Sequence, residues 1–99
     1  MKVEFAEEAE RSLEQIGDYI ALDSPARAES FTRELIDAAL VLGDAPRAYP
    51  LVPRFERLGV RRRVHGNYVI LYRVETHRVF VVQIVHGARD YGRLLLPED

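Results

Sequence analysis

The first half of the chain has the hydrophobic spacing of two helices. Residues 2–5 alternate polar and apolar side chains and are expected to form a short strand. Beyond them the apolar positions recur every three or four residues, which predicts an amphipathic helix that ends near Asp23. The apolar face of this helix is formed by Ala9, Leu13, Ile16 and Ile20.

A second helix is predicted to start at the dipeptide Ser24-Pro25. The serine supplies a capping oxygen, and proline suits the first helical position because that position needs no intrahelical N–H bond. Gly43 is expected to end the helix in a left-handed conformation. The two helices then form an antiparallel hairpin. The apolar face of the second helix is formed by Ala28, Phe31, Leu35, Ala38, Ala39 and Leu42.

Residues 44–58 separate this hairpin from the rest of the chain. They contain Pro46, Pro50 and Pro53, which are incompatible with a continuous helix or a central strand. We therefore expect an extended connection that runs over the surface.

The remaining sequence alternates with the period of strands. Turn residues at 66–67 and 75–77 divide it into three antiparallel strands. The second and third strands are apolar on both faces and are predicted to be central. One face is expected to pack on the helices, and the other must be covered by residues 94–96 or by a partner chain. The three predicted strands span residues 60–65, 68–74 and 79–86.

These elements predict an α+β fold, with an N-terminal helical hairpin packed on a small antiparallel sheet of about four strands. Residues 2–5 supply the additional strand. The chain has 99 residues, is 47% apolar and contains no Gly/Ser-rich linker, so one domain over residues 1–99 is expected. It has neither an apolar run of roughly 18 residues nor an export segment. A soluble, cytoplasmic protein without a membrane partner is therefore expected.

Charge is unevenly distributed along the sequence. Residues 1–45 carry 11 acidic and 4 basic side chains, whereas residues 46–99 carry 10 basic and 5 acidic ones. Thirteen of the 14 basic residues are arginine, whose planar fork suits contacts with carboxylates and phosphates, although a GC-rich genome gives the same bias. The second half is thus predicted to carry a recognition surface. With no cysteine and three widely separated histidines, no metal site and no cofactor are predicted.

Three segments in the second half carry a family resemblance: Gly-Val-Arg-Arg-Arg-Val at 59–64, Tyr-Val-Ile-Leu-Tyr-Arg-Val at 68–74 and Ile-Val-His-Gly-Ala-Arg-Asp at 84–90. In this order, and with two helices upstream, they resemble the RelE/ParE superfamily of type II toxin-antitoxin toxins. The His-Gly-Ala-Arg-Asp ending is most similar to the ParE, or plasmid stabilisation, branch. The resemblance implies a growth-inhibiting toxin that a cognate antitoxin neutralises by wrapping around it in a hetero-oligomer.

The two branches imply different activities. ParE-like toxins inhibit DNA gyrase by protein-protein binding, which requires no catalytic residue, and this is our leading interpretation. RelE-like toxins are ribosome-dependent endoribonucleases that cut mRNA without a metal. Such a reaction needs a base, a cation and an acid, and the candidates here are Arg63, His86, Arg89 and Tyr91, with Glu56 matching other nuclease members in residue type. A third possibility is a degenerate member that only binds its antitoxin.

The residues expected to bind partners are basic or apolar positions of the second half: Arg61, Arg63, Arg73, Arg89, Leu94 and Leu95. Structural roles compete with these functional ones. His86 can hydrogen-bond at a strand end, and residues 61–63 can form a charged edge strand that discourages aggregation. Because Arg62 shares a strand face with Val60 and Val64, it must lie toward the core side, snorkel or meet an acidic partner.

Overall fold

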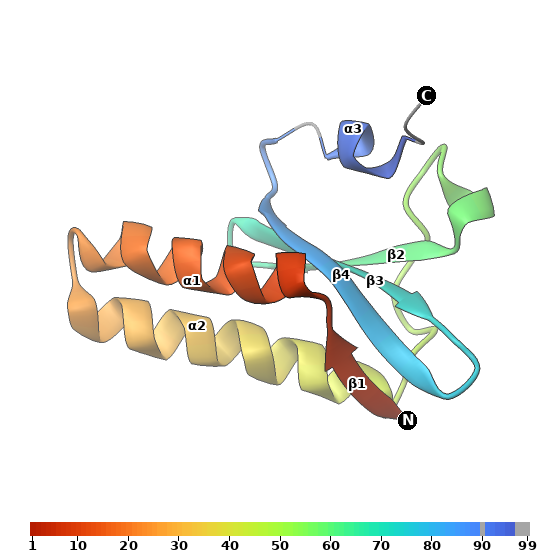
Figure 1. Cartoon of the computed structure of the whole chain (residues 1–99), viewed down its shortest axis with the longest axis horizontal. Coiled ribbons are helices and arrows are strands. Elements are labelled where there is room, and N and C mark those ends of the chain that lie inside the picture. Colours follow the sequence, from red (N-terminus) through yellow and green to blue (C-terminus); the bar gives the residue numbers. More distant parts are fainter. Residues whose placement is uncertain (90, 97–99) are drawn as a thin grey trace.

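A helical hairpin lies across one face of a four-stranded sheet in the computed structural model, which describes residues 1–89 and 91–96 (Figure 1). The predicted α+β class is therefore confirmed. In chain order the elements are β1 (Lys2–Phe5), α1 (Glu7–Ala21), α2 (Pro25–Leu40), the 3-10 turns η1 (Val41–Gly43) and η2 (Glu56–Leu58), β2 (Val60–His65), β3 (Tyr68–Val74), β4 (Arg78–His86) and the short helix α3 (Gly92–Leu95).

The sheet has the strand order β1-β4-β3-β2. Strands β2, β3 and β4 form the predicted antiparallel meander. The sheet is nevertheless mixed, because β1 pairs in parallel with β4, so the expectation of a purely antiparallel sheet was wrong. Parallel neighbours need a long connection between them, and here the helical hairpin and the first two strands of the meander supply it.

The helix boundaries follow the local signals in the sequence. Ser24 caps α2, with its Oγ accepting a hydrogen bond from the N–H of Arg27 at 3.2 Å, and Pro25 occupies the first turn. Ala6 precedes α1 and supplies no side-chain cap. Instead, the negative charges of three glutamates in the first turn interact favourably with the positive end of the helix dipole and stabilise the start of the helix. Both predicted helices are thus confirmed.

Gly43 has a different role from the one expected. The chain continues from α2 into η1, and Gly43 has no positive φ, so it does not end the helix in a left-handed conformation. Instead the terminal amino group of Met1 donates to the carbonyl oxygen of Gly43 at 2.8 Å. A Cβ at position 43 would lie 2.2 Å from the carbonyl oxygen of Met1. Glycine is required there by this close approach of β1, which depends on a contact between distant parts of the chain.

The main core fills the space between the hairpin and the sheet. Leu35 of α2 and Ile70, Tyr72 and Val81 of the sheet are fully buried in it, and the Tyr72 hydroxyl donates to the carbonyl oxygen of Pro46 at 2.8 Å. This burial raises the pKa of Tyr72. Each such apolar side chain contributes roughly 1.5–3 kcal/mol when it leaves water.

The opposite side of the sheet, here called the open face, carries a second core of Val52, Val60, Val69, Leu71 and Val85. Phe55, Tyr91 and Leu95 pack against it. The expected cover by residues 94–96 is therefore confirmed only for Leu95, since Leu94 is 41% exposed and Leu96 is 56% exposed. Phe55, from the proline-rich connection, is a cover residue that the sequence did not indicate.

No helix within the described part of the chain combines the length and the apolar composition that a membrane crossing requires.

Gly43→Ala tests the contact between β1 and η1. Because the added Cβ would overlap the Met1 carbonyl, we expect a loss of about 1–3 kcal/mol in unfolding free energy and faster amide exchange in residues 2–5. Chemical denaturation and hydrogen exchange measure the two effects. Gly59→Ala is the control for a loss of stability without this overlap. Its Cβ meets no atom within 4 Å, but its φ of +69° strains any L side chain, so it should destabilise the fold without faster exchange confined to residues 2–5. Unchanged exchange in β1 of Gly43→Ala would refute the contact's importance.

Candidate functional site

The arginines of β2 divide between the two faces of the sheet. Arg61 and Arg63 are half-buried on the helix side, where they pair with Tyr72 and Ile70 of β3. Arg61 Nη1 donates to the carbonyl oxygen of Tyr49 at 2.7 Å, and Arg63 Nη1 donates to that of Ala38 at 2.6 Å. Ala38 lies in the last turn of α2. These two candidate recognition arginines therefore join the connection and the end of α2 to the sheet.

Arg62 lies on the open face with Val60 and Val64. Its Nη1 donates to the hydroxyl of Tyr91 at 2.8 Å, which links β2 to the C-terminal segment across the second core. Of the alternatives left open by the sequence, Arg62 takes a half-buried position with a polar, uncharged partner. It was not among the candidate site residues, although strand alternation had placed it on this apolar face.

A shallow cleft of about 390 Å³ opens beside this hydrogen bond. His86, at the end of β4, forms part of its wall, and its Nδ1 accepts a hydrogen bond from the N–H of Ala88 at 3.1 Å. A neutral imidazole with this acceptor carries its proton on Nε2. The cleft is lined by Arg62, Val64, Gly66, Asn67, Val69, His86, Gly87, Ala88 and Tyr91.

The four residues proposed for the nuclease alternative do not surround one point. His86 and Tyr91 line the open-face cleft, whereas Arg63 is held on the helix side. Arg89 lines another cleft, against α1, which His86 also borders but Arg63 and Tyr91 do not. Glu56 is the first residue of η2, and its side chain accepts a hydrogen bond from the N–H of Arg54 at 2.8 Å. The cation that shares a cleft with His86 and Tyr91 is Arg62.

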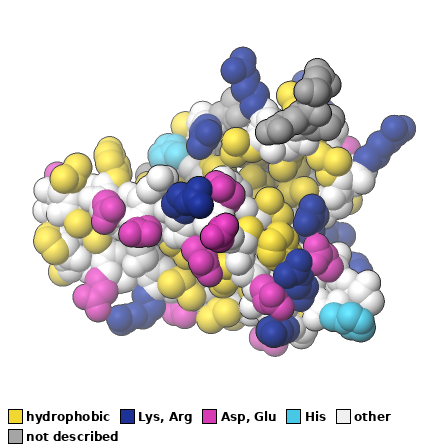
Figure 2. Space-filling view, in the orientation of Figure 1, with side chains coloured by type: hydrophobic (Ala, Val, Ile, Leu, Met, Phe, Trp, Pro, Cys, Tyr) yellow, Lys and Arg dark blue, Asp and Glu magenta, His cyan; other side chains and the backbone are white. Residues whose placement is uncertain are grey.

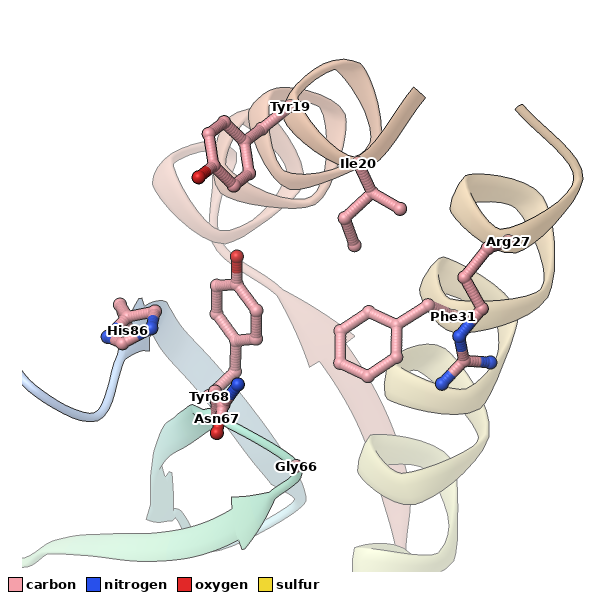
Figure 3. A pocket seen from close by; sticks show the side chains of 8 residues that line it. All are labelled: Tyr19, Ile20, Arg27, Phe31, Gly66, Asn67, Tyr68 and His86. Atoms are coloured by element: carbon pink, nitrogen blue, oxygen red, sulfur yellow. The ribbon is translucent and has the colours of Figure 1, made fainter. Parts of the chain in front are cut away.

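A second cleft, of about 580 Å³, lies on the helix side of the sheet. It lies between the tip of the helical hairpin, where α1 meets α2, and the turn between β2 and β3 (Figure 3). The Tyr68 ring stands between Phe31 and His86 and points its hydroxyl toward α1 (Figure 3). The ring centroids of Tyr68 lie 5.6 Å from Phe31 and 5.3 Å from His86, within the range of favourable aromatic pairs. His86 therefore borders a cleft on each side of the sheet.

One carboxylate holds this tip together. Glu34 accepts hydrogen bonds from Arg27 at 2.6 Å and from His65 at 3.2 Å, so it ties α2 to the end of β2. The hydrogen bond from Arg27, and then that from His65, lowers the pKa of Glu34.

The remaining candidates lie at the other end of the sheet or in the C-terminal segment. Arg73 pairs with Glu75 at 3.2 Å and lies over the Phe80 ring. Arg78 also binds Glu75, at 2.6 Å, and lowers the pKa of that carboxyl. Leu95 packs on the open face, while Leu94 faces solvent.

The charge segregation of the sequence is visible on the surface. Several acidic side chains lie over α1, whereas most basic side chains in this view lie over the sheet and the C-terminal part (Figure 2). In residues 1–89 and 91–96 no three histidine, aspartate or glutamate side chains form a group that could hold a metal ion.

Comparison with known proteins relates this architecture to toxins. The sequence model of the family described as ParE toxin of type II toxin-antitoxin system, parDE, matches residues 3–91. No curated protein matches the sequence. A chain of the chromosomal ParDE toxin-antitoxin system from P. aeruginosa has a similar structure, with a TM-score of 0.70 and 20% identity over 87% of this chain and 95% of that one. A chain of the RelBE2 toxin-antitoxin complex from Mycobacterium tuberculosis has a TM-score of 0.63 and 24% identity over 86% of this chain and 95% of that one. At these identities the two likenesses establish the fold.

Tyr91→Phe tests the hydrogen bond that closes the open-face cleft. Removing the hydroxyl leaves the packing of the ring in place but releases Arg62, so the C-terminal segment should open more often. We expect amide exchange in residues 91–95 to accelerate about fivefold, which corresponds to the roughly 1 kcal/mol of a typical hydrogen bond. Tyr19→Phe, on exposed α1, is the matched control, and equal exchange in both variants would show that the bond does not hold the segment.

Acid titration tests the role of Glu34. Because its pKa in the folded chain lies below the ordinary value of 4.5, its carboxylate stabilises the fold above that pH, and the contribution is lost as pH falls through the lowered pKa. Between about pH 5 and pH 3 the Tm of Glu34→Gln should therefore decrease less than the Tm of the unchanged chain. Part of the decrease should remain, because the pKa of Glu75 is also lowered in the folded chain. Glu14→Gln on α1 is the control; an unchanged slope in Glu34→Gln would contradict this assignment.

Proposed function

The chain belongs to the ParE toxin family of type II toxin-antitoxin systems, and from this premise we propose that it inhibits DNA gyrase by protein-protein binding and is neutralised by a cognate antitoxin. Both interactions take place in the cytoplasm and form hetero-oligomers without a metal or cofactor. The observation that carries the proposal is the family match over residues 3–91, which spans the helical hairpin, all of the sheet except Lys2, and the residues that line the open-face cleft.

The arrangement of the arginines supports a binding role. Arg61 and Arg63 donate to backbone carbonyls within the fold, so they serve the scaffold before any ligand arrives. Arg62 and the exposed Arg89 border shallow clefts at the end of the sheet. Basic and apolar groups combined on a shallow surface suit a protein partner with carboxylates around an apolar contact.

One observation favours the nuclease alternative. Arg62, His86 and Tyr91 line the same cleft, and they supply a cation, a titratable imidazole and a hydroxyl. A phosphate in the cleft would meet Arg62 directly. In this alternative the chain would cleave mRNA on the ribosome, with Arg62 in the place that the sequence assigned to Arg63.

A supercoiling assay run beside a ribosome-dependent mRNA cleavage assay separates the two functions. The purified chain is expected to block supercoiling by gyrase, or to accumulate cleaved DNA, and to leave mRNA intact. Codon-positioned mRNA cuts with unaffected gyrase would instead establish the nuclease.

His86→Ala sharpens the assay. A nuclease that uses His86 should lose about 100-fold or more of its mRNA cleavage with its fold retained, whereas gyrase inhibition does not require a proton donor. His77→Ala, in the exposed turn between β3 and β4, is the matched control. If the chain affects neither growth nor gyrase nor mRNA, only the third possibility remains, a degenerate family member that binds its antitoxin without being toxic.

A further inference from the structure

The turn at residues 52–55 holds an arginine in a strained backbone conformation. The N–H of Phe55 donates to the carbonyl oxygen of Val52 at 3.0 Å and closes the turn. Arg54, the third residue of the turn, has a φ of 74°. A Cβ is disfavoured in this region, and turns of this kind take glycine or asparagine at the third position for that reason. Arginine at position 54 therefore costs free energy that either of these residues would avoid.

The second core fixes this conformation. Val52 is buried and Phe55 packs against the same cluster, so the two residues between them must reverse the chain within a short span. The carboxylate of Glu56 adds a constraint, because it accepts a hydrogen bond from the N–H of Arg54 at 2.8 Å. Hydrogen bonds from the backbone of Glu56 itself and of Arg54 lower the pKa of this carboxyl. Backbone strain persists where its surroundings determine it in this way.

The side chain of Arg54 offsets none of this cost within the fold. Arg54 is exposed, and within residues 1–89 and 91–96 its guanidinium forms no hydrogen bond, ion pair or ring contact. Arg57 is also exposed and has no such partner in this part of the chain. By contrast, Arg61, Arg62 and Arg63 each bind an oxygen of the fold. A strained residue whose side chain has no contact inside the fold points to a role outside it.

The side chains around the turn define the kind of partner that fits. Arg54 and Arg57 place two guanidinium groups within four residues, and their forked donors match carboxylates. Leu58, the next residue, is 45% exposed and supplies an apolar contact. Arginine beside exposed apolar surface is typical of protein interfaces. Nucleic-acid sites instead offer aromatic side chains to the bases, and Phe55, the aromatic residue of the turn, packs against the second core.

We propose that Arg54, Arg57 and Leu58 form a contact surface for a folded protein partner, in which each guanidinium binds a carboxylate of that partner. A tight, fixed turn presents a compact contact, which suits the surface of a folded protein better than a long extended segment. None of the three residues lines the clefts described above. The inference rests on the proposed function in one respect, because it assigns this surface to gyrase.

Arg54→Asn separates a role in binding from a role in the fold. Asparagine tolerates a positive φ and avoids the additional freedom that glycine gives the unfolded chain. We therefore expect an equal or higher Tm together with roughly tenfold or more weaker binding to purified gyrase. Arg57→Ala should weaken the binding to a similar extent. Arg47→Ala is the matched control, because Arg47 is an exposed arginine of the same connection whose side chain has no partner among the described residues.

The outcomes separate this inference from the proposed function. Gyrase affinity that is unchanged in both Arg54→Asn and Arg57→Ala would overturn the contact surface alone, and so would an equal loss in Arg47→Ala. A lower Tm of Arg54→Asn would show that the arginine supports the fold, which removes the basis of the proposal. Binding to a DNA duplex without gyrase that both variants lose would assign the surface to phosphates instead. If the unchanged chain does not bind gyrase, the proposed function fails and this inference fails with it.

Discussion

The central strands β3 and β4 must keep two apolar faces out of water, and the rest of the structure depends on this constraint. Residues of alternating orientation, such as Ile70 and Leu71, are both fully buried, each on a different side of the sheet. The helical hairpin covers one side with a layer of regular structure. The other is covered by Phe55, Tyr91 and Leu95, which come from a loop and a short C-terminal segment rather than from a layer of regular structure. The side with the thinner cover also holds the open-face cleft.

The arginines of β2 connect this sheet to everything that surrounds it. Two of them bind carbonyl groups of the connection and of α2, and the third binds Tyr91 across the open face. Consecutive residues of a strand point to opposite faces, so a run of three arginines necessarily serves both sides of the sheet. Their guanidinium groups therefore have two effects: they hydrogen-bond to other parts of the fold, and they contribute positive potential at the surface. Only the second of these effects is available to a partner.

The predictability of the site depended on whether its determinants were local. His86 was expected at a strand end, and it lies there with its Nδ1 bound to a backbone N–H two residues away. Arg63 was expected in the site because of its residue type, but Ala38, far away in the sequence, supplies the carbonyl that holds it on the helix side. Arg62 was passed over, although its alternation with two valines was a usable signal for the open face. The contact of Tyr91 with Arg62 had no signal in the sequence, because it joins segments 29 residues apart.

By itself the sequence determined the helices, the meander, the α+β class and the family resemblance, because spacing of apolar residues, a serine cap, prolines and turn residues act over a few neighbours. Ser24 and the turn at residues 66–67 illustrate this local control. Only the tertiary structure decided that β1 runs parallel to β4, that Gly43 makes room for Met1, and which arginine faces which side. These features arise from contacts between segments that are distant in sequence, and packing of the whole chain is what selects among the arrangements that the local pattern allows.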